Sequence, residues 1–313
     1  MEKKYIAGMD IRGGRNDDFY CSLLEYYPGG QRIFLKSLLQ LKDENSSRDT
    51  FIKDWADKYE LSDIVVDCPL VSPVCTTCAL ECPGEKKCPE VTIVEVRKKI
   101  NILLHEDQKK IVNHPKEYER NRNVSDEIEP ARDILRKSSK EHMLSRSFKK
   151  RLKKDILPYW NRPLDFWIWC NYYDALLEIF KTSYDSFGHS SMMLVYRVDY
   201  LKRHFPRNFN LFESDVDMVL IELLRAKIVT RNDLNELNIM GSAGLARLNI
   251  LKSLEEKLNL FIYDHEKEIL VKKPKAFESL LLALAGYRFH LGKTVEMPWW
   301  TRPGEVNFIL PVF

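Results

Sequence analysis

Three carboxylates stand where they could hold a metal ion. Asp10 closes the apolar run YIAGMD, Asp67 closes SDIVVD, and Glu278 is a single acid in the apolar stretch KPKAFESLLLALAGYRF. Two neighbouring carboxylates repel each other unless a cation neutralises them. Mg²⁺ or Mn²⁺ is the expected occupant, since such ions prefer oxygen ligands and can activate a water against a phosphodiester. For Glu278 the alternative is a place on the solvated face of its helix.

Four cysteines form the most specific local motif, with the pattern Cys75-x2-Cys78-x3-Cys82-x5-Cys88. Four thiolates at this density are typical of a tetrahedral Zn²⁺ site, and an iron–sulfur cluster is the competing interpretation. The segment resembles a zinc knuckle, although a knuckle carries a histidine where this chain has its third cysteine. Because the motif begins eight residues after Asp67, the loop could contact nucleic acid beside an active site, or it could simply staple the base of an insertion.

The net charge of +3 is unevenly distributed along the chain. Residues 97–154 contain 18 Lys or Arg and 9 Asp or Glu, and the segment 136–154 has nine basic residues against one acid. A solvated helix face and a phosphate-contacting arm are both consistent with this pattern. The residues that would contact phosphate lie in the densest part, SFKKRLKKD: Lys149, Lys150, Arg151, Lys153 and Lys154. Because the segment lacks interleaved aromatic residues, base stacking is not expected there.

The first 67 residues predict the elements that must position Asp10 and Asp67. Alternating or continuous apolar runs separated by turn residues predict a β-β-β-α-β order. In a mixed sheet that opens with three antiparallel strands, the first and fourth strands can lie side by side, so the two carboxylates would face each other near one edge. The strands are expected at residues 5–11, 19–27, 32–38 and 62–67, and the helix at 47–59.

The remaining chain predicts an α/β protein with helical additions. A core formed by 1–74 and 156–313 is expected to carry an insertion, 75–155, which contains the cysteine motif and a basic helical arm. Helices are expected at 158–182, 212–226 and 274–289 and within 231–260, and strand-like segments at 192–196, 260–264 and 307–313.

Composition limits the class of protein. An apolar fraction of 44% excludes wholesale disorder, and seven cysteines are too few for a disulfide scaffold of this length. No run of about 20 apolar residues and no secretory signal are apparent, so a cytoplasmic protein without a membrane span is expected. The sequence does not indicate an oligomeric state.

The order of these motifs resembles that of an uncharacterised family, a domain of unknown function whose members are regarded as predicted nucleases with a ribonuclease H-like fold. YIAGMDIRGG, IVVDCPLVSP and KAFESLLLALAGYRF before a final ILPV carry the resemblance. It implies a ribonuclease H-like mixed sheet with Asp10, Asp67 and Glu278 as catalytic acids, and Arg162-Pro-Leu-Asp165 is similar to the family's mid-chain R-x-x-D. Two positions differ from the family, because Lys275 replaces an aspartate and residues 194–197 lack the expected mid-chain glutamate.

Two functions therefore compete. The first is a Mg²⁺- or Mn²⁺-dependent nuclease, a hydrolase that cleaves DNA or RNA, in which Asp10, Asp67 and Glu278 hold the metal and Asp165 is a weaker candidate. Arg12 or the 136–154 arm would then bind phosphates. The second is a nucleic-acid-binding or interaction protein that retains the fold without catalysis, which the two departures from the family favour. A kinase-like ATPase is disfavoured by the lack of a Gly-rich phosphate loop.

Overall fold

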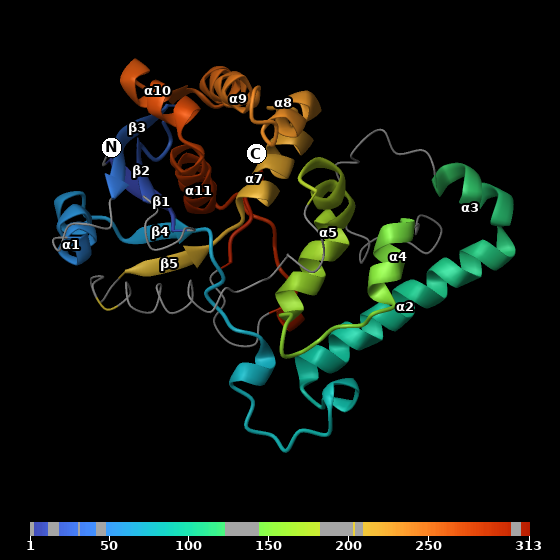
Figure 1. The fold of residues 1–313 in the computed structure, drawn as a ribbon. Helices are drawn as coiled ribbons and strands as arrows, with labels where there is room; N and C mark the ends of the chain where they lie inside the picture. The colour runs from blue at the N-terminus through green and yellow to red at the C-terminus, as the bar shows by residue number, and fades with distance from the viewer. Residues whose placement is uncertain are drawn as a thin grey trace. The chain divides into compact units, whose positions relative to one another are not determined.

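The computed structural model describes residues 3–11, 19–30, 32–41, 48–122, 144–181, 203, 209–301 and 308–313 (Figure 1). No helix within these ranges combines the length and the apolar character needed to cross a bilayer. The helices are α1 (Arg48–Lys58), α2 (Val91–Asn113), α3 (Pro115–Arg122), α4 (Arg146–Leu152), α5 (Pro163–Ile179), α7 (Val216–Arg225), α8 (Arg231–Glu236), α9 (Ala243–Leu258), α10 (Asp264–Lys272) and α11 (Pro274–His290). The strands are β1 (Lys4–Asp10), β2 (Phe19–Tyr26), β3 (Ile33–Leu41), β4 (Asp63–Val66), β5 (Asn210–Glu213) and β6 (Leu260–Phe261), and short 3₁₀ turns are η1 (Val74–Thr76), η2 (Glu85–Lys87) and η4 (Trp299–Thr301).

The chain divides into two compact units. One contains Met1–Leu70, Ser190–Val295 and Asn307–Phe313, and the other contains Val71–His189 and Glu296–Val306. The second unit begins near the start of the expected insertion but also takes in α5 and η4, which the sequence analysis placed with the core. Aromatic contacts explain this, because Phe166 of α5 packs against Trp300 of η4, with ring centroids 5.9 Å apart.

The first unit is built on a six-stranded mixed sheet with the order β5-β4-β1-β2-β3-β6. β1, β2 and β3 pair antiparallel, whereas β4 is parallel to β1, β5 is parallel to β4, and β6 is parallel to β3. This confirms the predicted α/β class, the β-β-β-α-β order and the side-by-side placement of the first and fourth strands. The carboxyl ends of β1, β4 and β5 therefore lie at the same edge of the sheet.

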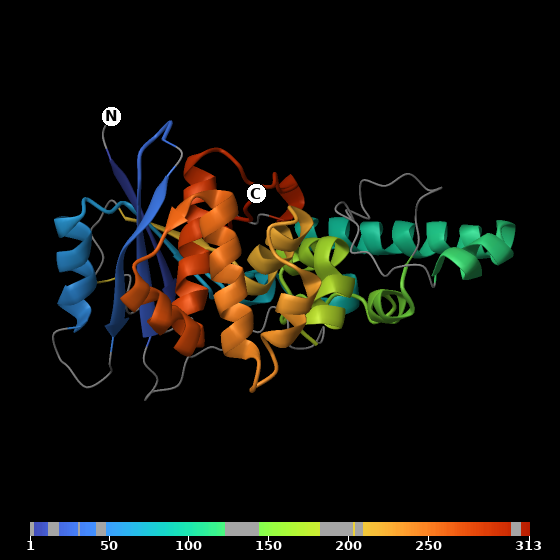
Figure 2. The ribbon, with the colours of Figure 1, turned by 90° about the horizontal axis from the view of Figure 1, so that it is seen from above.

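The two faces of the sheet are covered by different helices (Figure 2). On one face, Trp55 and Ala56 of α1 join a buried cluster with Ala7 and Met9 of β1. On the other face, α11 approaches β1 so closely that a Cβ atom added to Gly8 would lie 2.2 Å from the backbone of Ser279 and of Ala283. Glycine is required at this point because any side chain would collide with the helix.

The contacts of α11 also fix its direction. Near its C-terminal end, Gly286 approaches Ile6, whereas Ser279 approaches Gly8, so the helix runs antiparallel to β1. Ser22 of β2 and Ser279 share a hydrogen bond of 2.7 Å between their hydroxyl groups. Two strand residues span about 6.6 Å and four helical residues about 6 Å, so the first turn of α11 lies level with Asp10.

The helix expected at 212–226 is wrong at its start. Residues 210–213 form β5, and α7 begins only at Val216, because the side chain of Asp215 accepts a hydrogen bond from the amide of Met218 and caps the helix. The expected extended tail is confirmed where it is described, since Phe308 bridges Glu213 and Pro311 bridges Thr294. The strand expected at 192–196 lies outside the described residues.

The second unit contains α2, α3, α4, α5 and η4 and is held by a few buried contacts. Phe148 of α4 packs against Tyr173 of α5, with ring centroids 5.0 Å apart. Asp107 of α2 accepts a hydrogen bond from Tyr118 of α3 and pairs with Lys149 of α4. The helical character expected of the insertion is therefore confirmed for its described part.

Candidate functional site

Two of the predicted carboxylates are neighbours in the sheet. Met9 of β1 pairs with Val66 of β4, so Asp10, the last residue of β1, and Asp67, which directly follows β4, come next along the two parallel strands. Both are buried, with 0% and 2% of their surface exposed. Burial, and then the Asp10 carboxylate, raises the pKa of the Cys21 thiol on the adjacent strand β2.

Sequence reasoning missed a third acid at this edge, Glu213. It ends β5, pairs with Val66 in the parallel register and is 4% exposed. Its Oε2 atom accepts a hydrogen bond of 2.8 Å from the amide of Leu70, in the loop that follows Asp67. The signal in the sequence is the apolar pair Leu211-Phe212 immediately before the glutamate, but Phe212 and Glu213 fall within the helix expected at 212–226.

Glu278 lies elsewhere on α11. Successive helical residues turn by about 100°, so Glu278 does not share the face on which Ser279 and Gly286 meet the sheet. It is partly exposed, and it raises the pKa of Arg247 on α9, although burial of that guanidinium has the larger, opposite effect. The structure thus associates Glu278 with a cation of α9. The position level with Asp10 belongs to the first turn of α11, where Lys275 stands.

The fit of a divalent cation can be judged from this donor set. In the part of the chain that the structure describes, no three His, Cys, Asp or Glu side chains are grouped as metal ligands would be. Asp10, Asp67 and Glu278 therefore do not converge into a preformed metal site with three ligands. Mg²⁺, however, is usually held by only one or two carboxylates together with waters and substrate phosphates, so the Asp10–Asp67 pair fits it chemically.

The cysteine motif lies in an open loop of the second unit. Cys75, Cys78 and Cys82 are exposed, Cys88 is half-buried, and all four are free thiols. Burial raises the pKa of Cys75, and the other three thiols raise it further, so the four sit within electrostatic reach of one another. Four thiols in one loop fit Zn²⁺ chemically. In the described structure, however, the four thiols are not close enough together to form a preformed metal site.

Asp165 has a structural environment. It is the third residue of α5, and its carboxylate accepts hydrogen bonds from the backbone amide, Nε and Nη2 of Arg162, at 2.7, 3.0 and 2.9 Å. Both residues are buried in the second unit. This capping box and ion pair explain the R-x-x-D spacing without a catalytic role.

The predicted basic arm is only partly available to phosphate. Lys149 pairs with the buried Asp107, and Arg151 is buried, with its guanidinium 5.0 Å from the ring centre of Trp169. Lys150, Lys153 and Lys154 are exposed. Two of the five expected phosphate contacts therefore serve to hold α4 in place. Arg12 and residues 136–143 lie outside the described residues.

A further polar cluster lies at the opposite end of α11. Nε2 of His290 is 3.0 Å from Oδ2 of Asp63, and Nδ1 of His290 is 2.5 Å from the hydroxyl of Tyr26. Ser62 and Asn210 also donate to Asp63. The cluster connects the start of β4, the end of β2 and the end of α11, and no local sequence pattern indicated it.

Comparison of the chain with family models, with curated proteins and with solved structures returns no match. The fold and the geometry of the residues are therefore the basis for assigning a function.

Proposed function

We propose that this protein is a divalent-metal-dependent phosphodiester hydrolase of ribonuclease H-like fold that acts on nucleic acid. The observation that carries the proposal is the parallel register of β1 and β4, which sets Asp10 beside Asp67 at the carboxyl ends of the strands. This edge is where open α/β sheets commonly place their ligands. The mixed sheet and its strand order are compatible with the proposed fold.

The chain's own residues would have three tasks. Asp10 and Asp67 would hold Mg²⁺ or Mn²⁺, and Glu213 would fix the loop after β4 through the amide of Leu70. The bound ion would supply charge neutralisation and an activated water. Because both aspartates are closed to solvent, substrate binding would require a rearrangement that exposes them.

Cleavage assays with single- and double-stranded DNA and RNA, with Mg²⁺, Mn²⁺ or chelator, test the proposal. We expect the double variant Asp10→Asn, Asp67→Asn to lower metal-dependent cleavage at least about a hundredfold. The reason is that loss of the metal ligands removes a metal ion that would stabilise the transition state by several kcal/mol. Glu213→Gln should lower cleavage as well, whereas Glu278→Gln should retain it. Asp63→Asn, a buried aspartate at the other end of β4, is the matched control. Equal cleavage by wild type and the double variant refutes the proposal.

A second candidate is a nucleic-acid-binding protein without catalysis. It is favoured by the lack of a three-ligand group among the residues that the structure describes and by Lys275 on the first turn of α11. Binding of nucleic acid by the wild type without any metal-dependent cleavage would support this candidate over the first.

A further inference from the structure

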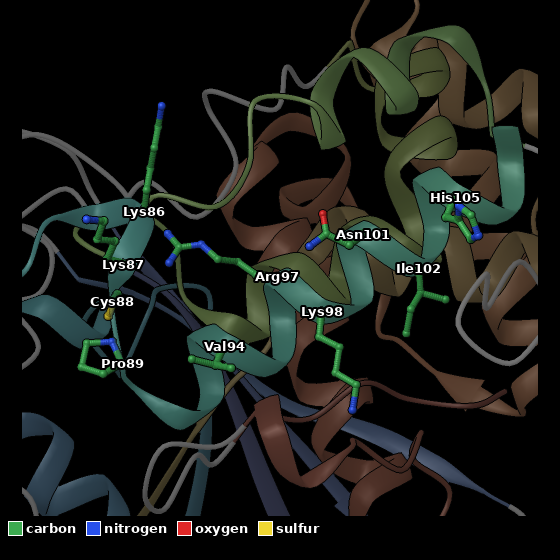
Figure 3. Close-up of a pocket in the computed structure, with 10 residues that line it drawn as sticks. All are labelled: Lys86, Lys87, Cys88, Pro89, Val94, Arg97, Lys98, Asn101, Ile102 and His105. Carbon is green, nitrogen blue, oxygen red and sulfur yellow. The ribbon is translucent and has the colours of Figure 1, made fainter.

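A groove in the second unit combines positive charge with exposed apolar side chains. It lies between η2 and the first half of α2 and has a volume of about 930 Å³. Its cations are Lys86, Lys87, Arg97 and Lys98, and none of the described residues that line it is acidic. Val94 and Ile102, which are 49% and 51% exposed, provide apolar surface beside these cations (Figure 3).

The helical spacing of the lining residues makes the groove elongated. Val94, Lys98 and Ile102 recur every four residues and form one stripe along α2, and Arg97, Asn101 and His105 form the adjacent stripe. From residue 94 to residue 105 the helix rises about 16 Å. Phosphates of an extended single strand lie further apart than the about 3.4 Å rise per phosphate of a B-form strand, so this length is enough for at most about five phosphates.

Most of the positive charge in the groove is not already neutralised. Within the described ranges, the side chains of Lys86, Lys87 and Lys98 make no ion pair or hydrogen bond. Arg97 extends toward η2, where it donates to the Glu85 carbonyl and, at 3.2 Å, to Asp155 (Figure 3). Arg97 thus links α2 to η2, and the three lysines are available to bind an anion.

We propose that this groove binds the backbone of a single-stranded nucleic acid. The three lysines favour an extended anion, and the apolar surface of Val94 and Ile102, with the ring of His105 beside it, can contact the bases of a single strand, which in a duplex are stacked inside. The inference rests on the proposed action on nucleic acid and names the surface that binds it. It also transfers the phosphate contacts from α4, where they were expected, to η2 and α2.

Fluorescence anisotropy with a labelled single-stranded oligonucleotide tests the groove. Binding is measured over a range of salt concentrations without added Mg²⁺ or Mn²⁺, in the Asp10→Asn, Asp67→Asn background, so that failure of the proposed catalysis does not affect the result. The groove variant is Lys86→Gln, Lys87→Gln, Lys98→Gln. The matched control is Lys150→Gln, Lys153→Gln, Lys154→Gln, which removes the same charge from exposed positions of the same unit.

Each phosphate contact on a single strand contributes about 0.7 to the slope of log affinity against log salt. The groove variant should therefore lose about 2 from this slope and roughly a hundredfold in affinity at about 0.1 M salt, while the control keeps the wild-type slope. Replacement of the same three lysines by arginine should restore binding. Equal effects of the two glutamine variants, an unchanged groove variant, or equally effective competition by polyglutamate would each overturn the proposal.

Discussion

Replacement of Gly8 by alanine tests the contact that sets α11 against β1. The added Cβ atom would lie 2.2 Å from the amide nitrogen of Ala283, 2.2 Å from the carbonyl oxygen of Ser279 and 2.8 Å from the carbonyl carbon of Leu282. All three are backbone atoms of one helix, so no side-chain rotation can relieve the collision. To restore an ordinary contact, α11 must retreat by about 1 Å.

We expect Gly8→Ala to destabilise the protein, although replacement of glycine by alanine in a strand usually stabilises it. Alanine in place of glycine within a strand normally stabilises by about 0.5–1 kcal/mol. Overpacking of a core costs about 1–3 kcal/mol, and a gap of about 1 Å also forfeits up to half of each dispersion contact that α11 makes with the sheet. We therefore expect Gly8→Ala to lower the free energy of unfolding by about 3 kcal/mol.

Urea unfolding followed by circular dichroism and tryptophan fluorescence measures this loss. Gly286→Ala is the matched control on the same interface, because its added Cβ would meet side-chain atoms of Ile6 and Val65, at 2.5 and 2.8 Å, and no backbone atom. Overpacking against these two buried, β-branched residues has a cost, but the control also gains about 1 kcal/mol of helix propensity, so its net loss should be about 1 kcal/mol and clearly smaller than that of Gly8→Ala. If Gly8→Ala proves as stable as wild type, or if both variants lose the same amount, the close approach is not as the structure has it.

Two further predictions concern the polar clusters. Burial raises the pKa of Asp63, but hydrogen bonds from His290, Ser62 and Asn210 outweigh it and hold the pKa below its ordinary value. Asp63→Asn should therefore cost about 2 kcal/mol of unfolding free energy near pH 7. This difference should begin to shrink as the pH falls below about 4, the ordinary pKa of the carboxyl group, and should be lost only when the pH has passed below the lower pKa of Asp63 in the folded protein. A difference that stays constant in urea titrations across this range contradicts the argument. For the cysteine loop, elemental analysis should find about one zinc per chain, with no visible absorbance from an iron–sulfur cluster. Cys75→Ser with Cys78→Ser should remove the zinc, whereas Cys170→Ser, at a buried cysteine, should retain it; iron in the purified protein would refute zinc.

The strand arrangement was predictable because it depends on local patterns and a topological rule. The short apolar runs ending in Asp10 and Asp67 are buried in adjacent strands, and the turn residues between them separate the elements correctly. The order in which β5 and β6 join the two edges could not be read from the sequence. β6 has two residues and β5 has four, too few for a period to show.

Glu213 shows why the site was incompletely predicted. Residues 212–226 have apolar side chains at helical spacing, which predicts a helix. The apolar pair Leu211-Phe212 before Glu213 is too short to predict a strand against that pattern. Only the parallel pairing with β4 and the cap at Asp215 separate the strand from the helix. Glu213 pairs with Val66, and the side chains of successive strand residues point to opposite faces, so Glu213 points to the face of the sheet opposite that of Asp67.

The small residues of α11 indicate which side of the helix faces the sheet. Ser279, Ala283 and Gly286 recur at spacings of four and three, which is the pattern of a helix face that approaches a strand closely. Position 275 falls four residues before Ser279 and shares that face, whereas position 278 is turned by about 100° from it. The residue that the helix brings level with Asp10 is therefore a cation, where the resembling family has an acid. A lysine there, together with the positive N-terminal end of α11, adds fixed positive charge at the level of Asp10 and so lowers the demand for a second metal ion. The charge at this edge thus argues for at most one divalent cation, held by Asp10 and Asp67.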